Sequence, residues 1–284
     1  MILTILMILK KNKFEIGFIQ GRLSKQRTRI QQFPWRYWKK EFIKAKKLKL
    51  DLIEWTIDNF KFFKNPLFLK EYFHKIKNLQ KKNNIKINSV TADFFMEKPF
   101  WKQKRSQIYL NRLNLLINAC GKHNINFIIL PLVDNSSIKN LTEEKKIISN
   151  LSKFDENLKK YNVNILFEID YKPQKILNFI KKFNRKYYGI NYDLGNSASL
   201  SFKVKNEFNV YGKYIKNIHI KDRKRNGKTV RLGKGNANFK SLFKILNRKK
   251  NKLPLILQTA RALKKGDDYK ELEINLNFIK KYIS

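Results

Sequence analysis

Short apolar runs alternate with longer amphipathic stretches along this chain. Eight of the runs are rich in β-branched and aromatic residues and end at polar or turn-forming positions, which is typical of buried strands. They are FEIGFI (14–19), DLIEW (51–55), IKINSVT (85–91), NFIILP (126–131), VNILFEI (163–169), YYGINYD (187–193), YIKNIHI (214–220) and LPLILQT (253–259). The sequence therefore predicts eight strands.

Each predicted strand is followed by a stretch in which apolar residues recur at helical spacing. Two of these stretches have recognisable start signals. Thr142 is followed by two glutamates, and Pro173 stands at a first helical position. The expected helices lie near 36–49, 67–83, 102–122, 142–160, 173–183, 206–213, 238–250 and 268–282.

Strands that alternate with helices predict a parallel sheet of the α/β class. Eight such units in 284 residues favour a closed (β/α)8 TIM barrel over an open doubly wound sheet. No change in composition marks a second domain, so residues 14–284 are predicted to form a single barrel domain. Residues 1–13 are apolar with their lysines at the end, which is unlike a secretory signal, and they are predicted to be an N-terminal extension.

The chain is strongly basic, with 63 Lys and Arg against 22 Asp and Glu and a formal net charge of +41. Such a charge suggests an anionic partner, either nucleic acid or a membrane surface. The lysines are spread over almost every predicted helix and loop, however, so a compositional bias explains the charge better than a nucleic-acid partner does.

Two further features of the composition indicate a cytoplasmic protein that does not bind membranes. No apolar run reaches the roughly 18 residues that a membrane-spanning helix needs. The single cysteine, Cys120, excludes an internal disulfide and fits a reducing compartment.

The polar residues at the strand ends carry the main functional signal. In a barrel of this kind the active site lies at the carboxyl ends of the strands. Acidic residues are scarce in this chain, yet they stand at most of these ends. The strand-end residues are Gln20, Arg22, Glu54, Trp55, Asp93, Asp134, Asn135, Glu168, Asp170, Asp193, Asn196, His219, Asp222, Gln258 and Arg261.

Glu168, Asp193 and His219 stand in or at the end of the apolar fifth, sixth and seventh strands. A carboxylate is costly to bury unless it is paired or bound to a cation. For any one of the three a structural pair is an equally good explanation. Together, two oxygen ligands and one nitrogen ligand on successive strands suit Mn²⁺, Mg²⁺, Co²⁺ or Zn²⁺. The other histidines, His74 and His123, are predicted to lie on a helix and in a turn at the opposite face of the barrel.

Ten segments carry a family resemblance and occur in the family order over nearly the whole chain after residue 14. They are GFIQGRLS, IQQFPW, DLIEWTID, SVTADFF, LPLVDNSS, ILFEID, NYDLGN, NIHIKDR, LGKGNANF and LILQTARA. The chain resembles the xylose isomerase-like TIM barrels, and within them the sugar phosphate isomerase/epimerase family.

The resemblance implies a site with one divalent metal ion bound by Glu168, Asp193, His219 and, in the fourth place, Gln258. It also implies a reaction in which Glu168 removes the proton beside a carbonyl through a metal-stabilised enediolate, with Glu54 across the barrel as the alternative base. The family has a glutamate where this chain has Gln258. An amide oxygen can bind a metal but cannot act as a base, which favours one-base isomerisation or another proton donor over two-base epimerisation.

The implied substrate is a small sugar or sugar phosphate. Six polar residues near the strand ends are expected to hold its hydroxyl or acidic groups, although a salt bridge at the rim is the alternative for each arginine: Gln20, Arg22, Lys221, Asp222, Arg223 and Arg261. The glycine-rich stretch 226–239 would offer backbone N–H groups to a phosphate, with Asn238 as the cap of the helix that follows.

Two other functions stay open at this point. A binding or vestigial barrel without turnover is favoured by Gln258. An abasic-site endonuclease is suggested by the charge. The resemblance implies that such enzymes bind a cluster of several metal ions, and one histidine near the site cannot supply enough ligands for it. The sequence leaves open whether the chain forms a homo-oligomer.

Overall fold

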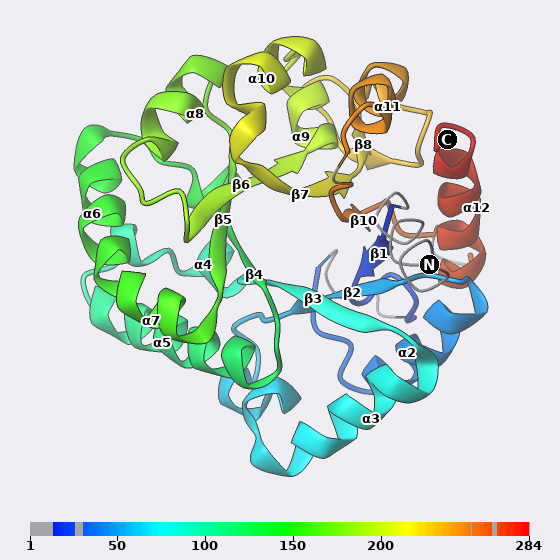
Figure 1. The fold of residues 1–284 in the computed structure, drawn as a ribbon, viewed down its shortest axis with the longest axis horizontal. Helices are drawn as coiled ribbons and strands as arrows, with labels where there is room; N and C mark the ends of the chain where they lie inside the picture. The colour runs from blue at the N-terminus through cyan, green and yellow to red at the C-terminus, as the bar shows by residue number, and fades with distance from the viewer. Residues whose placement is uncertain (1–13, 26–30, 251, 263–265, 284) are drawn as a thin grey trace, which may run out of the picture.

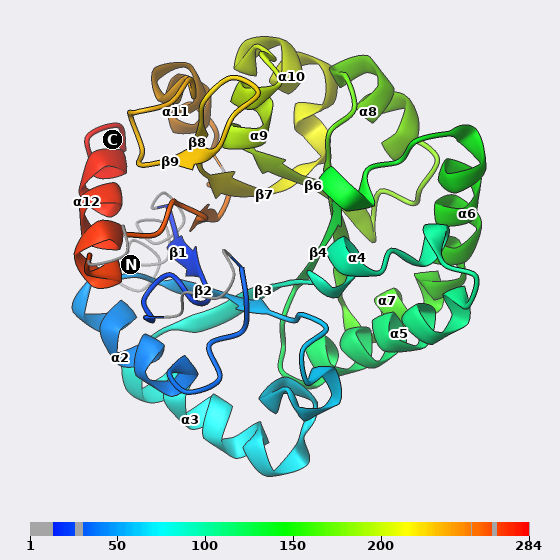
Figure 2. The same ribbon diagram turned by 180° about the vertical axis from the view of Figure 1, so that it is seen from behind.

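The computed structural model describes residues 14–25, 31–250, 252–262 and 266–283, so the predicted extension at 1–13 lies outside the described residues. Eight parallel strands close into a barrel in the order β1-β10-β7-β6-β5-β4-β3-β2, and the helices surround it (Figures 1 and 2). The predicted (β/α)8 fold is confirmed. The barrel strands are β1 (Ile16–Ile19), β2 (Leu52–Thr56), β3 (Lys86–Thr91), β4 (Phe127–Leu132), β5 (Asn164–Ile169), β6 (Tyr188–Asp193), β7 (Ile215–Ile220) and β10 (Leu255–Leu257).

The helices follow the predicted order around the barrel. They are α2 (Trp38–Lys47), α3 (Phe73–Asn83), α4 (Phe94–Glu97), α5 (Ser106–Lys122), α6 (Leu141–Leu151), α7 (Asp155–Tyr161), α8 (Pro173–Ile180), α9 (Leu194–Ser199), α10 (Val204–Tyr211), α11 (Phe239–Asn247) and α12 (Asp268–Lys280). Seven 3₁₀ helices lie between them: η1 (Phe62–Lys64), η2 (Pro66–Phe68), η3 (Lys70–Tyr72), η4 (Phe100–Lys102), η5 (Asp134–Ser136), η6 (Ser152–Phe154) and η7 (Gly212–Tyr214). Across the described residues no helix combines the length and the hydropathy needed to cross a membrane.

The helix start signals were partly correct. Pro173 is the first residue of α8, and the Asn238 side chain accepts a hydrogen bond from Ser241 N at 2.9 Å as the cap of α11. Thr142 is not the cap of its helix, because α6 already begins at Leu141. The cap is Asn140, whose side chain accepts from Glu143 N at 2.9 Å. Asparagine satisfies the same orphan N–H groups that threonine would.

Three elements near the carboxyl ends of the strands differ from the predicted pattern. The helix α4 follows β3, and α9 begins directly at the end of β6, with the Asp193 side chain as its cap. After β7 a small antiparallel hairpin forms from β8 (Asp222–Arg223) and β9 (Thr229–Val230). All three are too short for the hydrophobic pattern to give a signal for them. They shape the rim where the predicted site lies.

The loop that follows β1 is fixed from beneath by Glu41 of α2. This carboxylate is fully buried and accepts from Gly21 N at 3.0 Å, from Leu23 N at 3.1 Å and from Ser24 Oγ at 2.8 Å. Gly21 has φ +89°, a left-handed conformation that glycine adopts without strain. Burial raises the pKa of Glu41 to about 7, although the hydrogen bonds from this loop oppose the shift. The contact sets where the predicted substrate residue Arg22 stands.

We expect Glu41→Ala to lower the free energy of unfolding by about 2–5 kcal/mol, because it leaves buried N–H groups unpaired and opens a cavity. Urea unfolding followed by circular dichroism measures the loss. The matched control is Glu71→Ala at an exposed position, which should change the stability by less than about 0.5 kcal/mol. An equal, small effect of both substitutions would contradict the anchoring role of Glu41.

Candidate metal centre and active site

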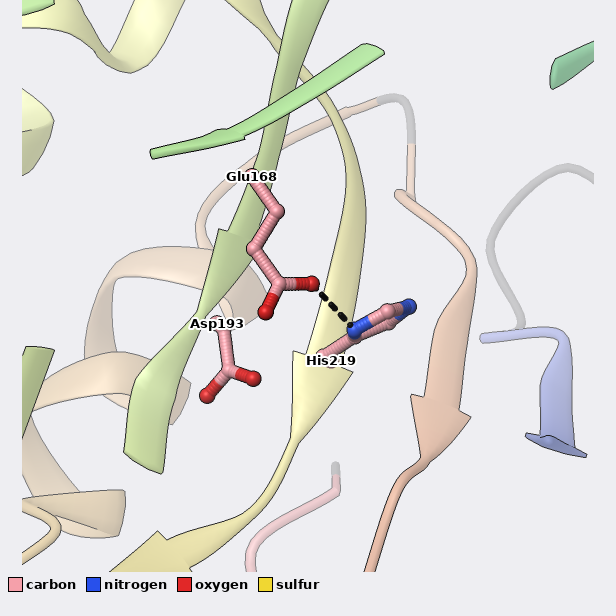
Figure 3. Close-up of side chains that lie close together, drawn as sticks. All are labelled: Glu168, Asp193 and His219. Atoms are coloured by element: carbon pink, nitrogen blue, oxygen red, sulfur yellow. Dashed lines mark ion pairs between the residues drawn. The ribbon is translucent and has the colours of Figure 1, made fainter. Parts of the chain in front are cut away.

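The three predicted metal ligands converge at the carboxyl ends of adjacent strands. Glu168 is the penultimate residue of β5, Asp193 ends β6 and His219 lies in β7, and one ligand atom from each falls within 4.8 Å of the others (Figure 3). Asp193 and His219 are direct partners in the parallel register. All three residues are at most 6% exposed. Two buried carboxylates beside a buried imidazole form a donor set that suits a divalent cation.

The imidazole of His219 lies between two carboxylates. Its Nδ1 atom is 3.0 Å from Glu168 Oε2, and its Nε2 atom is 2.8 Å from Glu54 Oε1. The second contact lacks the alignment of a good hydrogen bond, so charge attraction accounts for it. Burial opposes protonation of the ring, but the two carboxylates outweigh it and hold the pKa of His219 well above its usual range.

Glu54 has a different place from the one expected for a base across the barrel. Its side chain is fully buried against His219, and its Oε2 atom accepts from Ser89 Oγ at 2.8 Å. It is absent from the described residues that line the cavity above the site. Both oxygens of Glu54 face protein groups, a position suited to fixing the orientation of the His219 ring. Its role as the alternative base stays a prediction.

A second layer of asparagines surrounds the ligands. Asn191 Nδ2 donates to Glu168 Oε2 at 2.9 Å, and its own Oδ1 accepts from Asn217 Nδ2 at 2.8 Å. Asn196 Nδ2 donates to Glu168 Oε1 at 2.7 Å, so both oxygens of that carboxylate are held. The sequence analysis missed Asn191 and Asn217. Each lies two positions before a predicted ligand, and strand periodicity puts such residues on the same face.

Gln258, the fourth predicted ligand, is connected to Asp193 by the side chain of Lys221. The Lys221 ammonium lies 3.1 Å from Asp193 Oδ2 and 3.1 Å from Gln258 Oε1. Asp193 Oδ2 and Gln258 Oε1 therefore both lie next to the Lys221 ammonium group. The pKa of Asp193 is raised by burial, which outweighs the attraction of Lys221. Burial acts the same way on Glu168, but the hydrogen bond and charge of His219 outweigh it and lower the pKa of Glu168, so this carboxylate is ionised.

A cavity of about 300 Å³ opens above these residues at the carboxyl ends of the strands. Three predicted site residues besides Glu168 line it: Arg22, Lys221 and Gln258. Arg22 is 5% exposed and donates from Nε to the carbonyl oxygen of Thr259 at 2.8 Å. Burial and the nearby Arg261 lower the pKa of Arg22 to about 9. The cavity is thus lined by the Glu168 carboxylate, by the basic side chains of Arg22 and Lys221, and by further acidic residues.

Three predicted substrate residues do not line this cavity. The Oε1 atom of Gln20 accepts from Thr56 N at 3.0 Å, which ties β1 to β2. Arg223 donates to Asn196 Oδ1 at 2.9 Å, and Arg261 donates to the carbonyl oxygen of Gly21 at 2.5 Å. These contacts support the rim of the site, so contact of the three side chains with a substrate stays a prediction.

Asp222, the sixth of these residues, anchors the glycine-rich loop. Its carboxylate is fully buried and accepts from Gly233 N at 2.9 Å, Gly235 N at 2.8 Å and Ala237 N at 3.0 Å. A Cβ atom at Gly235 would lie 2.0 Å from Asp222 Oδ1, so only glycine fits there. These three N–H groups already have an acceptor, so the expected backbone cradle for a phosphate does not form from them, and the Asp222 oxygens face the loop.

The two remaining histidines lie away from the site, as predicted. His123 follows α5 and packs against Phe73 of α3, with ring centroids 5.1 Å apart. His74 lies in α3 beside the same phenylalanine. Within the part of the chain that the structure describes, Glu168, Asp193 and His219 are the one group of three His, Cys, Asp or Glu side chains placed to share a metal ion. The described residues thus offer no multi-metal cluster of the kind expected of an endonuclease.

Comparisons with known proteins agree with the fold. A family model described as xylose isomerase-like TIM barrel matches residues 42–282. A probable L-ribulose-5-phosphate 3-epimerase from Mycoplasma pneumoniae is 25% identical over 232 residues, which cover 78% of this chain and 76% of that protein.

Solved structures share the fold at lower identity. D-psicose 3-epimerase from Clostridium cellulolyticum, solved with D-tagatose, has a TM-score of 0.71 at 11% identity, over 95% of this chain and 100% of that one. The IOLI protein, solved with a bound zinc atom, has a TM-score of 0.70 at 16% identity, again over 95% of this chain and 100% of that one. At such identities the likeness extends to the fold alone.

We expect Asp222→Ala to release the loop 233–237, because three backbone N–H groups lose a buried acceptor at about 1–3 kcal/mol each. Hydrogen exchange measured by mass spectrometry should become faster in this loop, and the melting temperature should fall by several degrees. Lys234→Ala, at an exposed position of the same loop, is the control and should leave the exchange unchanged. Unaltered exchange in both variants would show that Asp222 does not hold the loop.

Proposed function

Because the chain belongs to the xylose isomerase-like TIM barrel family, we propose that it is a divalent-metal-dependent isomerase or epimerase of a small sugar or sugar phosphate. The observation that carries this proposal is the convergence of Glu168, Asp193 and His219 beneath a cavity at the carboxyl ends of the strands. The name of the Mycoplasma pneumoniae relative supports the isomerase class and a ketose phosphate as substrate.

The metal ion would be held by Glu168, Asp193 and His219, with the amide oxygen of Gln258 as the fourth donor. The fit rests on two observations. The first three donors are buried and mutually close, and the ammonium of Lys221 occupies a point shared by Asp193 and Gln258, which marks it as favourable for a cation. Mn²⁺, Mg²⁺, Co²⁺ and Zn²⁺ all accept this mixed oxygen and nitrogen set. When bound, the ion supplies the charge that stabilises an enediolate.

Glu168 is the base that the chain itself provides. It is ionised, its two oxygens are fixed by Asn191 and Asn196, and it borders the cavity. A base held by two hydrogen bonds stays in one orientation, which is what removal of a proton beside a carbonyl requires. Glu54 keeps the His219 ring in place from below and contributes through that ring.

The substrate's anionic or hydroxyl groups would meet Arg22 and Lys221. Both line the cavity, and a planar guanidinium suits a phosphate or carboxylate. A volume of about 300 Å³ is at the lower end for small-molecule sites, in keeping with a monosaccharide. Direct contacts from Gln20, Asp222, Arg223 and Arg261 are not needed for this arrangement.

A barrel that binds a sugar without turnover is the second candidate. Gln258 favours it, because the amide at the end of β10 replaces a carboxylate and is already paired with Lys221. The two candidates differ in proton transfer, which only the catalyst performs.

We expect Glu168→Ala and His219→Ala to lose the bound metal ion, because each removes one of three close ligands. The metal content of protein purified and loaded with Mn²⁺, Co²⁺ or Zn²⁺ is measured by mass spectrometry. The matched control is His123→Ala, which removes a histidine far from the site and should retain full occupancy, as should Gln258→Glu. Full occupancy in both Glu168→Ala and His219→Ala would end the metal-site proposal.

Proton abstraction has its own test. In D₂O the metal-loaded protein should exchange the hydrogen beside the carbonyl of at least one ketose among L-ribulose 5-phosphate, D-psicose and D-tagatose, detected by proton NMR. Glu168→Gln should slow this exchange by about 100-fold or more, since a positioned base contributes roughly that much. A protein that binds metal but exchanges no hydrogen with any of these sugars would be the non-catalytic barrel.

A further inference from the structure

Two-base epimerisation needs two carboxyl groups, and this chain has the amide of Gln258 where the family has the second one. Inverting a carbon through an enediolate needs one group to remove the proton and a second to return a proton from the other side. An amide has no acidic proton of this kind. If the proposed function includes epimerisation, the second group must come from elsewhere in the cavity.

Asp93 is a carboxyl group in that cavity which no interaction of the site uses. It lies two residues after the end of β3 and lines the cavity together with Glu168. Its Oδ1 atom accepts from Thr91 Oγ1 at 2.5 Å. Its Oδ2 atom is buried and finds no hydrogen-bond partner among the described residues. A buried carboxyl oxygen without a partner is costly, and such exceptions call for a functional explanation.

The position of Asp93 in the barrel separates it from the base. β3 and β5 lie on either side of β4, so Asp93 and Glu168 enter the cavity from different walls. Gln258 follows β10, which is on the opposite side of Glu168 in the strand order. A sugar lying between these walls would present different faces to the two carboxyl groups.

We propose that Asp93 is a catalytic residue that donates the second proton in an epimerisation, in place of the carboxylate that Gln258 lacks. Glu168 takes the proton as the carbon–hydrogen bond breaks, and the electron pair moves into the enediolate. Asp93 then gives its own proton to the same carbon from the other side, so a new carbon–hydrogen bond forms there. Glu168 ends protonated and Asp93 ends as a carboxylate. Atoms and charge balance, and the reverse reaction uses the two groups in exchanged roles.

The charges around Asp93 suit an acid. Burial raises its pKa to about 7, and the nearby carboxylates Asp58, Glu54 and Glu168 add to this, while the Thr91 hydroxyl opposes it. Arg22 is the facing cation. Because the pKa is raised, the carboxyl group keeps its proton below about pH 7 and loses it above. Donation by Asp93 should therefore weaken as the pH rises through about 7. The other titratable groups that line the cavity are Glu97, Asp134 and Lys221.

The test separates removal of the proton from its return and rests on the proposed function. In D₂O, Asp93→Asn loaded with Mn²⁺ should still exchange the substrate hydrogen within about threefold of the wild-type rate, because Glu168 is intact. Formation of the epimer should fall by about 100-fold, the usual contribution of a general acid. The probes are L-ribulose 5-phosphate, D-psicose and D-tagatose. The control is Asp267→Asn, at the exposed cap of α12 and outside the described lining of the cavity, where asparagine caps equally well, and it should retain both rates.

A second readout needs no turnover. Carboxyl carbon NMR of metal-free protein labelled at aspartate should show one signal that titrates near pH 7 and disappears in Asp93→Asn. In the wild type the epimerisation rate should also decline above about pH 7.

The outcomes distinguish the two proposals. If the wild type exchanges no substrate hydrogen, the proposed function and this inference both fail. If it exchanges hydrogen and Asp93→Asn still forms the epimer at the wild-type rate, this inference alone fails. It also fails if the wild type yields only the aldose, or if exchange and epimer formation fall together in Asp93→Asn, because a structural role would explain that result.

Discussion

The buried imidazole of His219 between Glu54 and Glu168 is the interaction on which the site depends. Two carboxylates this close would repel each other and be costly to bury, and the ring between them supplies the compensating charge. That arrangement also fixes which nitrogen faces which strand. Nε2 is turned toward β2, so Nδ1 is the atom beside Glu168 and the remaining ligands. A metal ion bound there would displace a proton from the ring, because only the neutral imidazole can bind it.

The surrounding structure serves to keep these charges in place. The strand register shifts between Ile53 and Glu54 and again between Ile190 and Asn191, so both irregularities fall immediately before residues that touch His219 or Glu168. Such shifts re-aim side chains at the end of a strand. The Asp193 carboxylate has two structural contacts: it accepts from Asn196 N as the cap of α9, and it accepts from the Lys221 ammonium.

The sequence was sufficient for the barrel and for the meeting of Glu168, Asp193 and His219 near the ends of β5, β6 and β7, because a charged residue in a continuous apolar run stands out. It was insufficient for Glu54 and Asp222. In the sequence both stand near a strand end, just as a cavity residue would. The stagger of neighbouring strands places Glu54 against His219. The path of the loop after β9 brings Gly233 and Gly235 to Asp222. Asn191 was missed for the opposite reason: a neutral side chain inside a strand gives no signal by itself.

The balance of charge at the cavity connects Gln258 with the nature of the substrate. The carboxyl groups of Glu54, Glu168 and Asp193 lie beside the basic side chains of His219 and Lys221, and Arg22 lines the cavity above them. A glutamate at position 258 would place one more negative charge beside Lys221, and the amide leaves that charge out. On the proposed function, an enediolate or a phosphate group would then supply negative charge at this point.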